Sequence, residues 1–330
     1  ASYVTVDGLT IENSGPKHQT VDAGITVRGA DNVKILRNRI RDCLFGINFE
    51  QTNRSVIEDN DITSLPVSLG LKGDGIRLWY SHGNLIRMNR TRYVRDNVFW
   101  YSSANKIYEN SGADSRYSLH FMYADRNEIL SNDYRRNSVG IFLMFSQGST
   151  LKRNFVADST GPFGIGIGMK ESSDILVEEN QILYNARGFY LDSSPYQPGT
   201  FNTFRGNEIN FNTTAFLLHG TLLPSLFESN VFKGNIEDVA NDTPESKLEI
   251  NTWRSNYWDN YEGFDRNDDG YGDIPHEQWM YADRIWSYLP AAKFFYASPV
   301  LDFMNFLWRL MPFSEPVLLA RDAPPQIRER

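Results

Sequence analysis

The chain has 330 residues, of which 41% are hydrophobic and 22% are charged, so it can bury a large core and is too apolar to be disordered. Its 41 acidic residues outnumber 33 basic ones, and this net charge of −8 argues against nucleic-acid binding, which requires a basic surface. The single cysteine, Cys43, excludes an internal disulfide and any multi-cysteine metal site, and we expect it to be buried.

The first residues, ASYVTVDGLTIENSG, are already typical of a strand followed by a turn. No basic segment leads into an apolar run, so we expect a mature or truncated protein whose leader and first portion lie outside this sequence. No apolar run reaches the ~18–20 residues that a membrane-spanning helix needs.

A repeat runs through most of the chain. Each copy contains an apolar pair separated by one residue, then two or three polar residues, then an asparagine. The asparagines are Asn38, Asn60, Asn89, Asn110, Asn132, Asn154, Asn180, Asn207 and Asn230, spaced 21 to 29 residues apart, with Asn13 expected in the same column. The flanking residues alternate with period two, which indicates short half-buried strands, and the fixed leucines of leucine-rich repeats are absent. The sequence therefore predicts an all-β fold, a right-handed parallel β-helix with coils of about 22 residues.

The asparagine column is interpreted as architecture. Each corner of a coil needs a residue that tolerates the left-handed backbone region and bonds to the backbone, and asparagine does both. Asparagines stacked one coil apart also bond to each other, as amide ladders do in cross-β structures.

A second set of segments predicts which side chains face outward. The inward pairs are Ile76/Leu78, Leu119/Phe121, Ile141/Leu143, Ile165/Ile167, Phe189/Leu191 and Phe216/Leu218. The outward column is then Trp79, Trp100, Met122, Met144, Gly168, Asp192 and His219, and the column two residues earlier is Arg77, Val98, His120, Phe142, Gly166, Tyr190 and Leu217. Neighbouring coils lie about 4.8 Å apart, so Met122 and Met144 should be direct neighbours with His120 beside them.

This outward column is unusually apolar. One interpretation is that a loop or the C-terminal segment covers it. Another is that His120, Met122 and Met144 bind copper, because thioether sulfur and imidazole favour Cu(I). Gly166 and Gly168, predicted one coil after Met144, would leave room for a bulky group.

A carbohydrate-active site is the alternative. Parallel β-helices often carry lyase, hydrolase or epimerase sites on one strand face, where carboxylates act as acids and bases. Tyr190, Asp192 and His219 would form such a group, whereas Glu50 lies several coils away. No pair of neighbouring carboxylates is visible in the outward columns.

After about residue 250 the repeat stops. Asp265, Asn267, Asp269 and Asp273 occupy positions 1, 3, 5 and 9 of a calcium-binding loop, with Gly270 at the sixth position. His276 stands at the twelfth position, where an EF-hand has a bidentate Glu. A calcium site and a metal-free turn held by Asx bonds both remain open.

A short helix is predicted near the C-terminus, with Ser298 as its N-cap, Pro299 in its first turn and Pro312 at its end. It either covers the β-helix or inserts into a groove of a membrane-bound partner. The expected organisation is a parallel β-helix over residues 1–250, an Asp-rich cap over 251–285, and the helix with an extended docking tail over 286–330.

Four segments together resemble one family. They are RYSLHFMYADRN and GIFLMFSQGSTLKRN in the coils, NYWDNYEGFDRNDDGYGDIPH after them, and SPVLDFMNFLWRLMPFSEPVLLARD near the end. They resemble the NosD family, periplasmic proteins for the maturation of nitrous-oxide reductase. The resemblance covers nearly the whole chain, and we expect the family's usual opening coils to lie outside this sequence.

The resemblance implies a periplasmic, non-enzymatic protein with transiently bound Cu(I). It would receive copper from a NosL-type chaperone and attach to a NosF/NosY-type ABC transporter through its C-terminal helix. It would then serve assembly of the copper sites of apo nitrous-oxide reductase.

Overall fold

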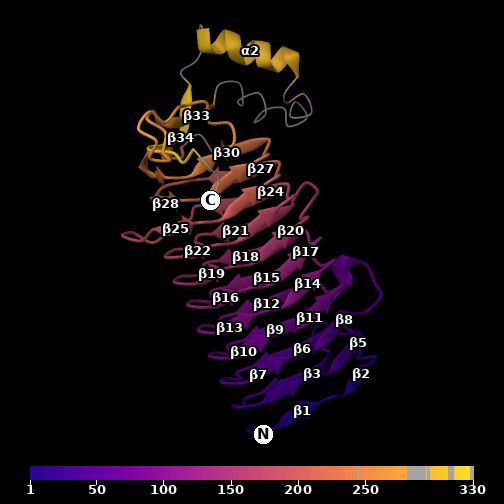
Figure 1. Cartoon of the computed structure of the whole chain (residues 1–330). Coiled ribbons are helices and arrows are strands. Elements are labelled where there is room, and N and C mark those ends of the chain that lie inside the picture. The colour runs from indigo at the N-terminus through magenta and orange to yellow at the C-terminus, as the bar shows by residue number, and fades with distance from the viewer. Residues whose placement is uncertain (244, 281–294, 296–297, 311–315, 328–330) are drawn as a thin grey trace.

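The computed structural model describes residues 1–243, 245–280, 295, 298–310 and 316–327. Successive strands wind into a solenoid in which every third strand pairs in parallel, so three sheets run along one long axis (Figure 1). Short 3₁₀ turns lie at Leu69–Leu71 and Leu248–Ile250, and the helix α2 spans Pro299–Leu310. The predicted all-β parallel β-helix is confirmed.

The first sheet consists mostly of three-residue strands, one from each coil, and ends in an antiparallel pair of longer strands. It orders β1 (Thr5–Asp7), β4 (Lys34–Leu36), β7 (Val56–Glu58), β10 (Leu85–Arg87), β13 (Lys106–Tyr108), β16 (Glu128–Leu130), β19 (Thr150–Lys152), β22 (Leu176–Glu178), β25 (Asn202–Arg205), β28 (Ser225–Glu228), β31 (Thr252–Arg254), β34 (Val317–Asp322) and β33 (His276–Met280).

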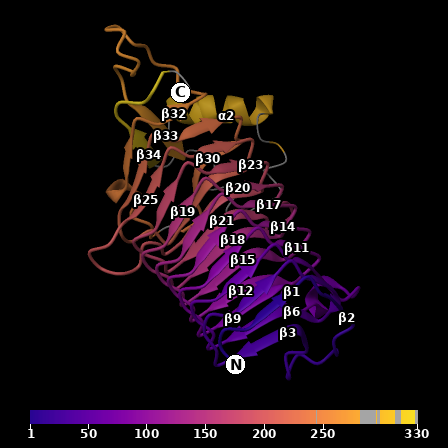
Figure 2. The ribbon, with the colours of Figure 1, turned by 60° about the horizontal axis from the view of Figure 1, so that its bottom comes forward.

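The second and third sheets complete each coil. The second orders β2 (Thr10–Glu12), β5 (Arg39–Cys43), β8 (Asp61–Ser64), β11 (Arg90–Arg92), β14 (Ser111–Ala113), β17 (Asp133–Arg135), β20 (Phe155–Ala157), β23 (Gln181–Leu183), β26 (Glu208–Asn210), β29 (Val231–Lys233) and β32 (Tyr257–Trp258). The third orders β3 (Ala23–Arg28), β6 (Phe45–Glu50), β9 (Ile76–Trp79), β12 (Asp96–Trp100), β15 (Tyr117–Met122), β18 (Val139–Met144), β21 (Ile165–Lys170), β24 (Arg187–Asp192), β27 (Thr214–His219) and β30 (Glu237–Asn241). Figure 2 shows the stacked strands along the axis.

The core is a set of apolar columns inside the solenoid. Most three-residue strands bury their middle residue and leave the outer two exposed or half-buried, as the alternation of a strand requires. Toward the C-terminal end the core becomes aromatic, with Phe204, Phe227 and Trp253 stacked at centroid distances of 4.9 and 3.8 Å. Cys43 is fully buried in this core, as predicted.

The predicted asparagine ladder is present. From Asn38 to Asn230, the Oδ1 atom of the next asparagine accepts hydrogen bonds from both the backbone N–H and the Nδ2 of the previous one, at 2.9 to 3.0 Å. Asn256 extends the ladder by one coil beyond Asn230. Asn13, however, lies outside it, because Leu9 is the residue whose N–H reaches Asn38.

The left-handed residue of each corner is not the asparagine. The residue immediately before each ladder position has φ between 49° and 62°: Arg37, Asp59, Met88, Glu109, Ser131, Arg153, Glu179, Gly206, Ser229 and Ser255. The expectation that asparagine supplies the left-handed conformation is therefore wrong. Asparagine recurs because its buried amide bonds to the neighbouring coils, and the strained corner accepts many residue types.

The β-helix continues past residue 250 and is closed by the end of the chain. Strand β31 pairs in parallel with β34, which comes from the end of the chain. Asp322 of β34 bonds to Asn256, although the two residues are 66 positions apart in the sequence. Asp322 Oδ2 accepts hydrogen bonds from Asn256 N (2.9 Å), Asn256 Nδ2 (2.8 Å) and Trp258 Nε1 (3.0 Å), so it takes the final place in the ladder. Residues 317–322 are thus part of the fold and not a free docking tail.

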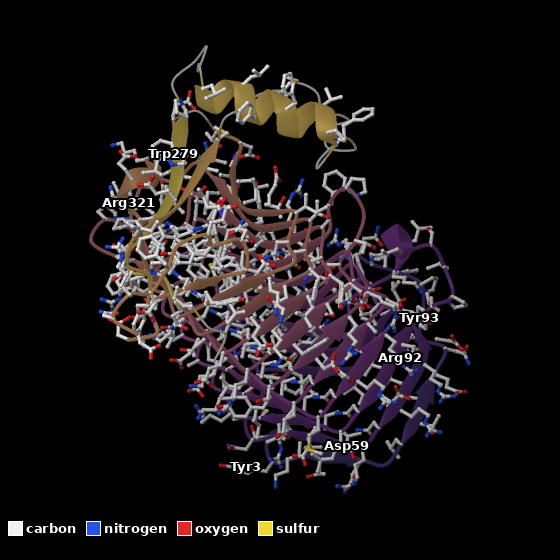
Figure 3. The ribbon with its side chains drawn as sticks, turned by 45° about the horizontal axis from the view of Figure 1, so that its top comes forward. Tyr3, Asp59, Arg92, Tyr93, Trp279 and Arg321 are labelled. Atoms are coloured by element: carbon white, nitrogen blue, oxygen red, sulfur yellow. The ribbon has the colours of Figure 1, made fainter. Side chains whose placement is uncertain are left out.

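Helix α2 begins and ends close to its predicted bounds and lies beyond the last coil (Figure 1). In Figure 3 it lies at the same end as Trp279 and Arg321, opposite Tyr3 and Asp59. Among its described side chains, Met304 is half-buried and five apolar ones are 42% to 68% exposed: Val300, Phe303, Phe306, Leu307 and Leu310. These five side chains are therefore largely open to solvent. Within the described residues we find no helix long and apolar enough to span a bilayer.

Candidate functional site

The outer face of the third sheet carries the predicted column, with one correction. In the observed register it is Trp79, Trp100, Met122, Met144, Lys170, Asp192 and His219. Lys170 occupies the place predicted for Gly168, because the coil after Met144 is shifted by two residues. Its inward pair is Ile167 and Met169, both fully buried, and not Ile165 and Ile167.

The predicted space beside Met144 is filled. Gly168 pairs with Phe142, and a Cβ atom on Gly168 would collide with the Phe142 ring. Gly166 does not open a space either, because a Cβ there would lie 2.7 Å from the Gly188 carbonyl oxygen and 3.0 Å from the buried Ile182. These glycines therefore allow close packing of neighbouring coils and do not open a site.

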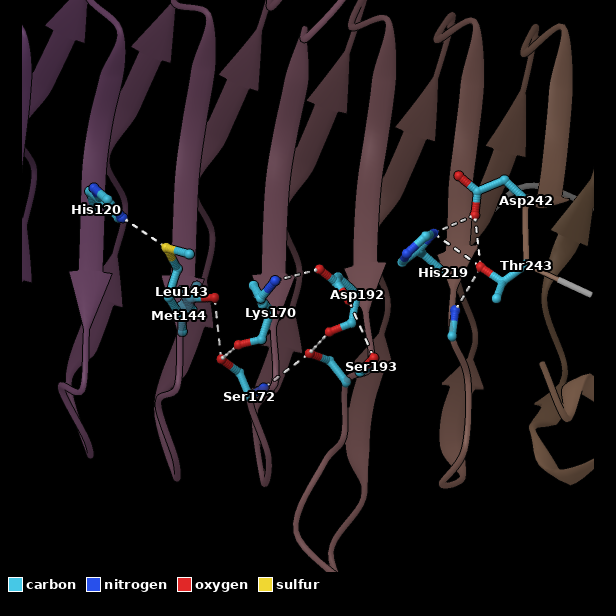
Figure 4. A network of polar contacts seen from close by, with 12 residues as sticks. His120, Leu143, Met144, Lys170, Ser172, Asp192, Ser193, His219, Asp242 and Thr243 are labelled. Carbon is cyan, nitrogen blue, oxygen red and sulfur yellow. Dashed lines mark hydrogen bonds and ion pairs between the residues drawn. The ribbon is translucent and has the colours of Figure 1, made fainter. Parts of the chain in front are cut away.

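The structure brings His120, Met122 and Met144 together. Met122 and Met144 are direct partners in neighbouring strands, and His120 Nε2 lies 3.2 Å from Met144 Sδ (Figure 4). Both methionines are half-buried, and His120 is only 9% exposed. The imidazole and the Met144 sulfur thus touch across two adjacent coils, with Met122 paired to Met144 in the strand register.

The ring of His120 is held in place from three sides. Tyr117 stacks on it at a centroid distance of 4.7 Å, and the edge of Phe142 approaches at 6.4 Å. Asp96 Oδ2 lies 3.8 Å from His120 Nδ1, beyond direct hydrogen-bonding distance. The second ring nitrogen thus faces a carboxylate, and Nε2 is left for Met144 or a ligand.

Asp96 stays ionised despite its burial. Burial would raise its pKa, but the hydrogen bonds and charge of Arg116, together with His120, hold the pKa below its ordinary value. Arg116 binds it through both Nε, at 2.8 Å from Oδ1, and the terminal guanidinium nitrogen. A buried negative charge therefore lies next to the imidazole.

A groove of about 320 Å³ opens beside these donors. Its lining includes His120, Met122 and Trp100, together with Asp74 and the arginines 77, 95 and 116. Burial raises the pKa of Asp74 to about 6, against the attraction of Arg95, whose guanidinium lies 3.2 Å away. His120 and Met122 therefore line a groove with charged walls, whereas Met144 is not part of its lining.

The donor set fits a soft cation. Among residues 1–243, 245–280, 295, 298–310 and 316–327 there is no group of three His, Cys, Asp or Glu side chains that would hold a metal ion. His120, Met122 and Met144 belong to another class, because two thioethers and one imidazole suit Cu(I) and suit Mg²⁺ or Ca²⁺ poorly. The unbranched Met144 side chain can rotate to admit an ion between its sulfur and Nε2.

The alternative group of Tyr190, Asp192 and His219 is also brought together. Asp192 and His219 are partners in neighbouring strands, and Tyr190 lies 6.0 Å from the His219 ring. Asp192, however, pairs with Lys170 at 3.3 Å, and His219 Nδ1 contacts Asp242 at 2.7 Å (Figure 4). Burial, and then the charge of Asp192, raises the pKa of Tyr190 to about 12, which disfavours the tyrosinate a general base would need.

The Asp-rich loop has the contacts of an Asx turn. The carboxylates of Asp265, Asp269 and Asp273 accept hydrogen bonds from backbone N–H groups of the loop at 2.7 to 3.2 Å. Asn267 Nδ2 donates to Asp269 Oδ2 at 2.9 Å. Calcium binding by these four residues stays a prediction.

Three residues around His120 were not identified from the sequence: Asp96, Arg116 and Tyr117. The register between β12 and β15 shifts between Asp96 and Val98, so Asp96 falls outside the alternating columns. The motif RDNVFWYSS contains Asp96, but the sequence does not indicate that its side chain points toward His120. Arg116 and Tyr117 were visible in RYSLHFM and could have been assigned from their spacing to His120.

Comparisons with known proteins agree with this architecture. A right-handed β-helix family model matches residues 1–95. The A-module of the mannuronan C-5 epimerase AlgE6 from Azotobacter vinelandii superposes with a TM-score of 0.52 at 16% identity, covering 68% of this chain and 64% of that one. At this identity the similarity shows the fold alone.

Two curated relatives cover most of the sequence. Each is titled "Probable ABC transporter binding protein NosD". The protein from Stutzerimonas stutzeri is 27% identical over 94% of this chain and 74% of its own length. The protein from Pseudomonas aeruginosa is 26% identical with the same coverage. The family model described as "Periplasmic copper-binding protein (NosD)" matches residues 63–263, which include His120, Met122 and Met144. The chain therefore belongs to the NosD family.

Proposed function

We propose that this chain is a periplasmic accessory protein that accepts Cu(I) at His120, Met122 and Met144 and passes it on for assembly of the copper sites of nitrous-oxide reductase. The observation that carries the proposal is the contact of His120 Nε2 with Met144 Sδ at 3.2 Å, with Met122 beside Met144 as its partner in the neighbouring strand. The description of the family model as a periplasmic copper-binding protein supports the same cargo.

The donor set suits a carrier. Neutral thioethers bind Cu(I) without adding charge, so the ion can be exchanged for donors of the same kind on a partner. His120 adds one stronger ligand, whose ring is stacked on Tyr117 and has the negative charge of Asp96 3.8 Å from its Nδ1. The groove beside the site gives a NosL-type donor protein and the apo reductase an approach.

The exposed apolar side chains of α2 support attachment to a membrane complex. Val300, Phe303, Phe306 and Leu307 are exposed at one end of the molecule, as a helix that binds in a groove of another protein requires. The titles of the two relatives as ABC transporter binding proteins support a NosF/NosY-type complex as that partner. Contact with the membrane would then run through the partner.

A Cu(I) titration against a competing chelator without oxygen tests the proposal. The native chain should bind one Cu(I), and His120→Gln, Met122→Leu and Met144→Leu should each lower the affinity at least about tenfold, because each removes a direct ligand. Met88→Leu is the matched control, since Met88 is an exposed methionine at a corner of another coil. Unchanged affinity in all three variants would contradict the proposed site.

A carbohydrate-active enzyme is the second candidate, supported by the cluster of Tyr190, Asp192, His219 and Asp242. The two candidate functions predict different results for variants of Tyr190 and Asp192. Tyr190→Phe and Asp192→Asn would abolish cleavage or epimerisation of an acidic polysaccharide, whereas the copper-handling proposal predicts no such activity in the native chain and unchanged Cu(I) affinity in both variants.

A further inference from the structure

Trp100 holds an unusual place beside the three donors. It precedes Met122 by one coil in the outward column, it is half-buried, and it lines the same groove as His120 and Met122. Its indole N–H is buried and has no hydrogen-bond partner among the described residues. The side chain is therefore positioned by ring packing, with its polar edge unsatisfied.

The direction of the Trp100 ring follows from its neighbours. Tyr80, Tyr101 and Tyr123 come from three successive coils and stack at 4.8 and 5.2 Å with interplanar angles of 11° and 8°. The faces of these rings are therefore turned toward the neighbouring coils. The Trp100 ring lies within 13° of the Tyr101 plane, so its two faces are turned along the same axis.

One face of Trp100 is already covered. Trp79, one coil earlier, lies 4.8 Å away at an interplanar angle of 74°, so its edge meets the face of Trp100. The opposite face is turned toward the coil that carries His120 and Met122. An ion bound by Met122 would lie on that side of the indole.

We propose that the face of Trp100 turned toward Met122 caps Cu(I) held by His120, Met122 and Met144 through a cation–π contact. This rests on the proposed function, and it deepens it by assigning a fourth residue to the site. Indole has the most favourable ring face for a cation, and the interaction strengthens where water is excluded. A neutral ring in place of a fourth ligand would shield the ion from water and oxygen without adding a donor that a partner must displace.

Indole fluorescence during the anaerobic Cu(I) titration tests the contact directly. One equivalent of Cu(I) should quench part of the native emission, and Trp100→Phe should remove that copper-dependent part while the chain still binds one ion. Trp79→Phe is the matched control, because Trp79 occupies the same column one coil further from Met122, and it should keep the quenching. Trp100→Leu should weaken Cu(I) binding about three- to thirtyfold, and its bound copper should oxidise faster in air.

The outcomes separate the two proposals. If Trp100→Phe and Trp100→Leu keep native affinity, quenching and oxidation rate while His120→Gln loses copper, the cap is refuted and the copper site stands. If the native chain binds no Cu(I), or binds it independently of His120, Met122 and Met144, both proposals fall. If quenching disappears equally in Trp79→Phe and Trp100→Phe, the signal does not come from a specific contact, and the cap is also refuted.

Discussion

Two columns of side chains run along the same axis, and they differ in how much the residue type changes from coil to coil. The inner ladder holds asparagine in every coil from Asn38 to Asn256 and ends in Asp322. The outer column of the third sheet changes from Trp to Met to Lys, Asp and His over seven coils. Both columns place one residue per coil, so the repeat itself does not explain the difference.

The difference lies in what each position must satisfy. Every ladder asparagine lies next to the same kinds of buried backbone groups, so the same side chain can form the required hydrogen bonds in each coil. The outer positions meet no such constraint, since strand pairing is complete without them. Where the constraint is absent, the side chain is free to serve another purpose, and the copper proposal rests on the Trp–Trp–Met–Met segment of this column.

Breaking the ladder should cause the largest effect. Asn132→Ala removes the acceptor for two donors of Asn110 and two hydrogen bonds donated by its own Nδ2, all buried. Each buried donor left without a partner costs ~1–3 kcal/mol, so we expect a loss of roughly 3 kcal/mol or more, measured by chemical denaturation.

Asp133→Ala is the control for this substitution. The neighbouring Asp133 is exposed on the surface, where it pairs with Arg135 at 2.6 Å, and surface ion pairs contribute about 0–1 kcal/mol. Equal destabilisation by Asn132→Ala and Asp133→Ala would show that the ladder does not stabilise the coils.

The last position of the ladder should respond to pH. Burial raises the pKa of Asp322 above its ordinary value of 3.8, although Trp258 and Asn256 donate hydrogen bonds to it. A raised folded-state pKa means that the associated stability is full below pH 3.8 and is lost as the pH rises through the folded-state pKa. Asp322→Asn completes the ladder without a charge, so at pH 8 it should be more stable than the native chain.

Denaturation of the native chain and Asp322→Asn at pH 4, 6 and 8 checks this. The advantage of the variant should shrink toward pH 4, where the native carboxyl is increasingly protonated. Parallel pH profiles for the two proteins would mean that Asp322 does not titrate in the way its burial implies.

Changing the outer column should have the smallest effect on stability. Met122→Leu and Met144→Leu conserve volume on a half-buried surface, so each should change the free energy of unfolding by less than ~1.5 kcal/mol. The same variants should lose Cu(I) affinity, which separates function from folding. A loss of stability comparable to that of Asn132→Ala would instead make the methionines structural.

The solenoid and its ladder could be predicted because one pattern recurs in every coil. The register of a single coil could not. Both Gly164-Ile165 and Gly166-Ile167 fit the frame of Gly140-Ile141, and a shift of two residues leaves the alternation of inward and outward side chains unchanged. The connection before Ile165 is longer than in the neighbouring coils, so counting residues could not distinguish the two registers. The outward position of Lys170 was therefore not predicted.

Contacts between segments far apart in the sequence could not be predicted from the repeat either. His120, Met122 and Met144 could be placed together because they lie on adjacent, regular coils. Asp96 reaches His120 through an irregularity in the register, and Asp322 joins Asn256 across 66 residues. Neither contact follows from periodicity, which describes only what successive coils share.

The closure of the β-helix also determines how α2 is attached. The chain leaves the β-helix at Met280 and returns at Val317, and these two residues are partners in the antiparallel pair of β33 and β34. Helix α2 is therefore tethered at two points that lie side by side, and β34 carries the final rung of the ladder. The two strands that flank the segment carrying α2 are thus hydrogen-bonded to each other, and the second of them places Asp322 at the last position of the ladder.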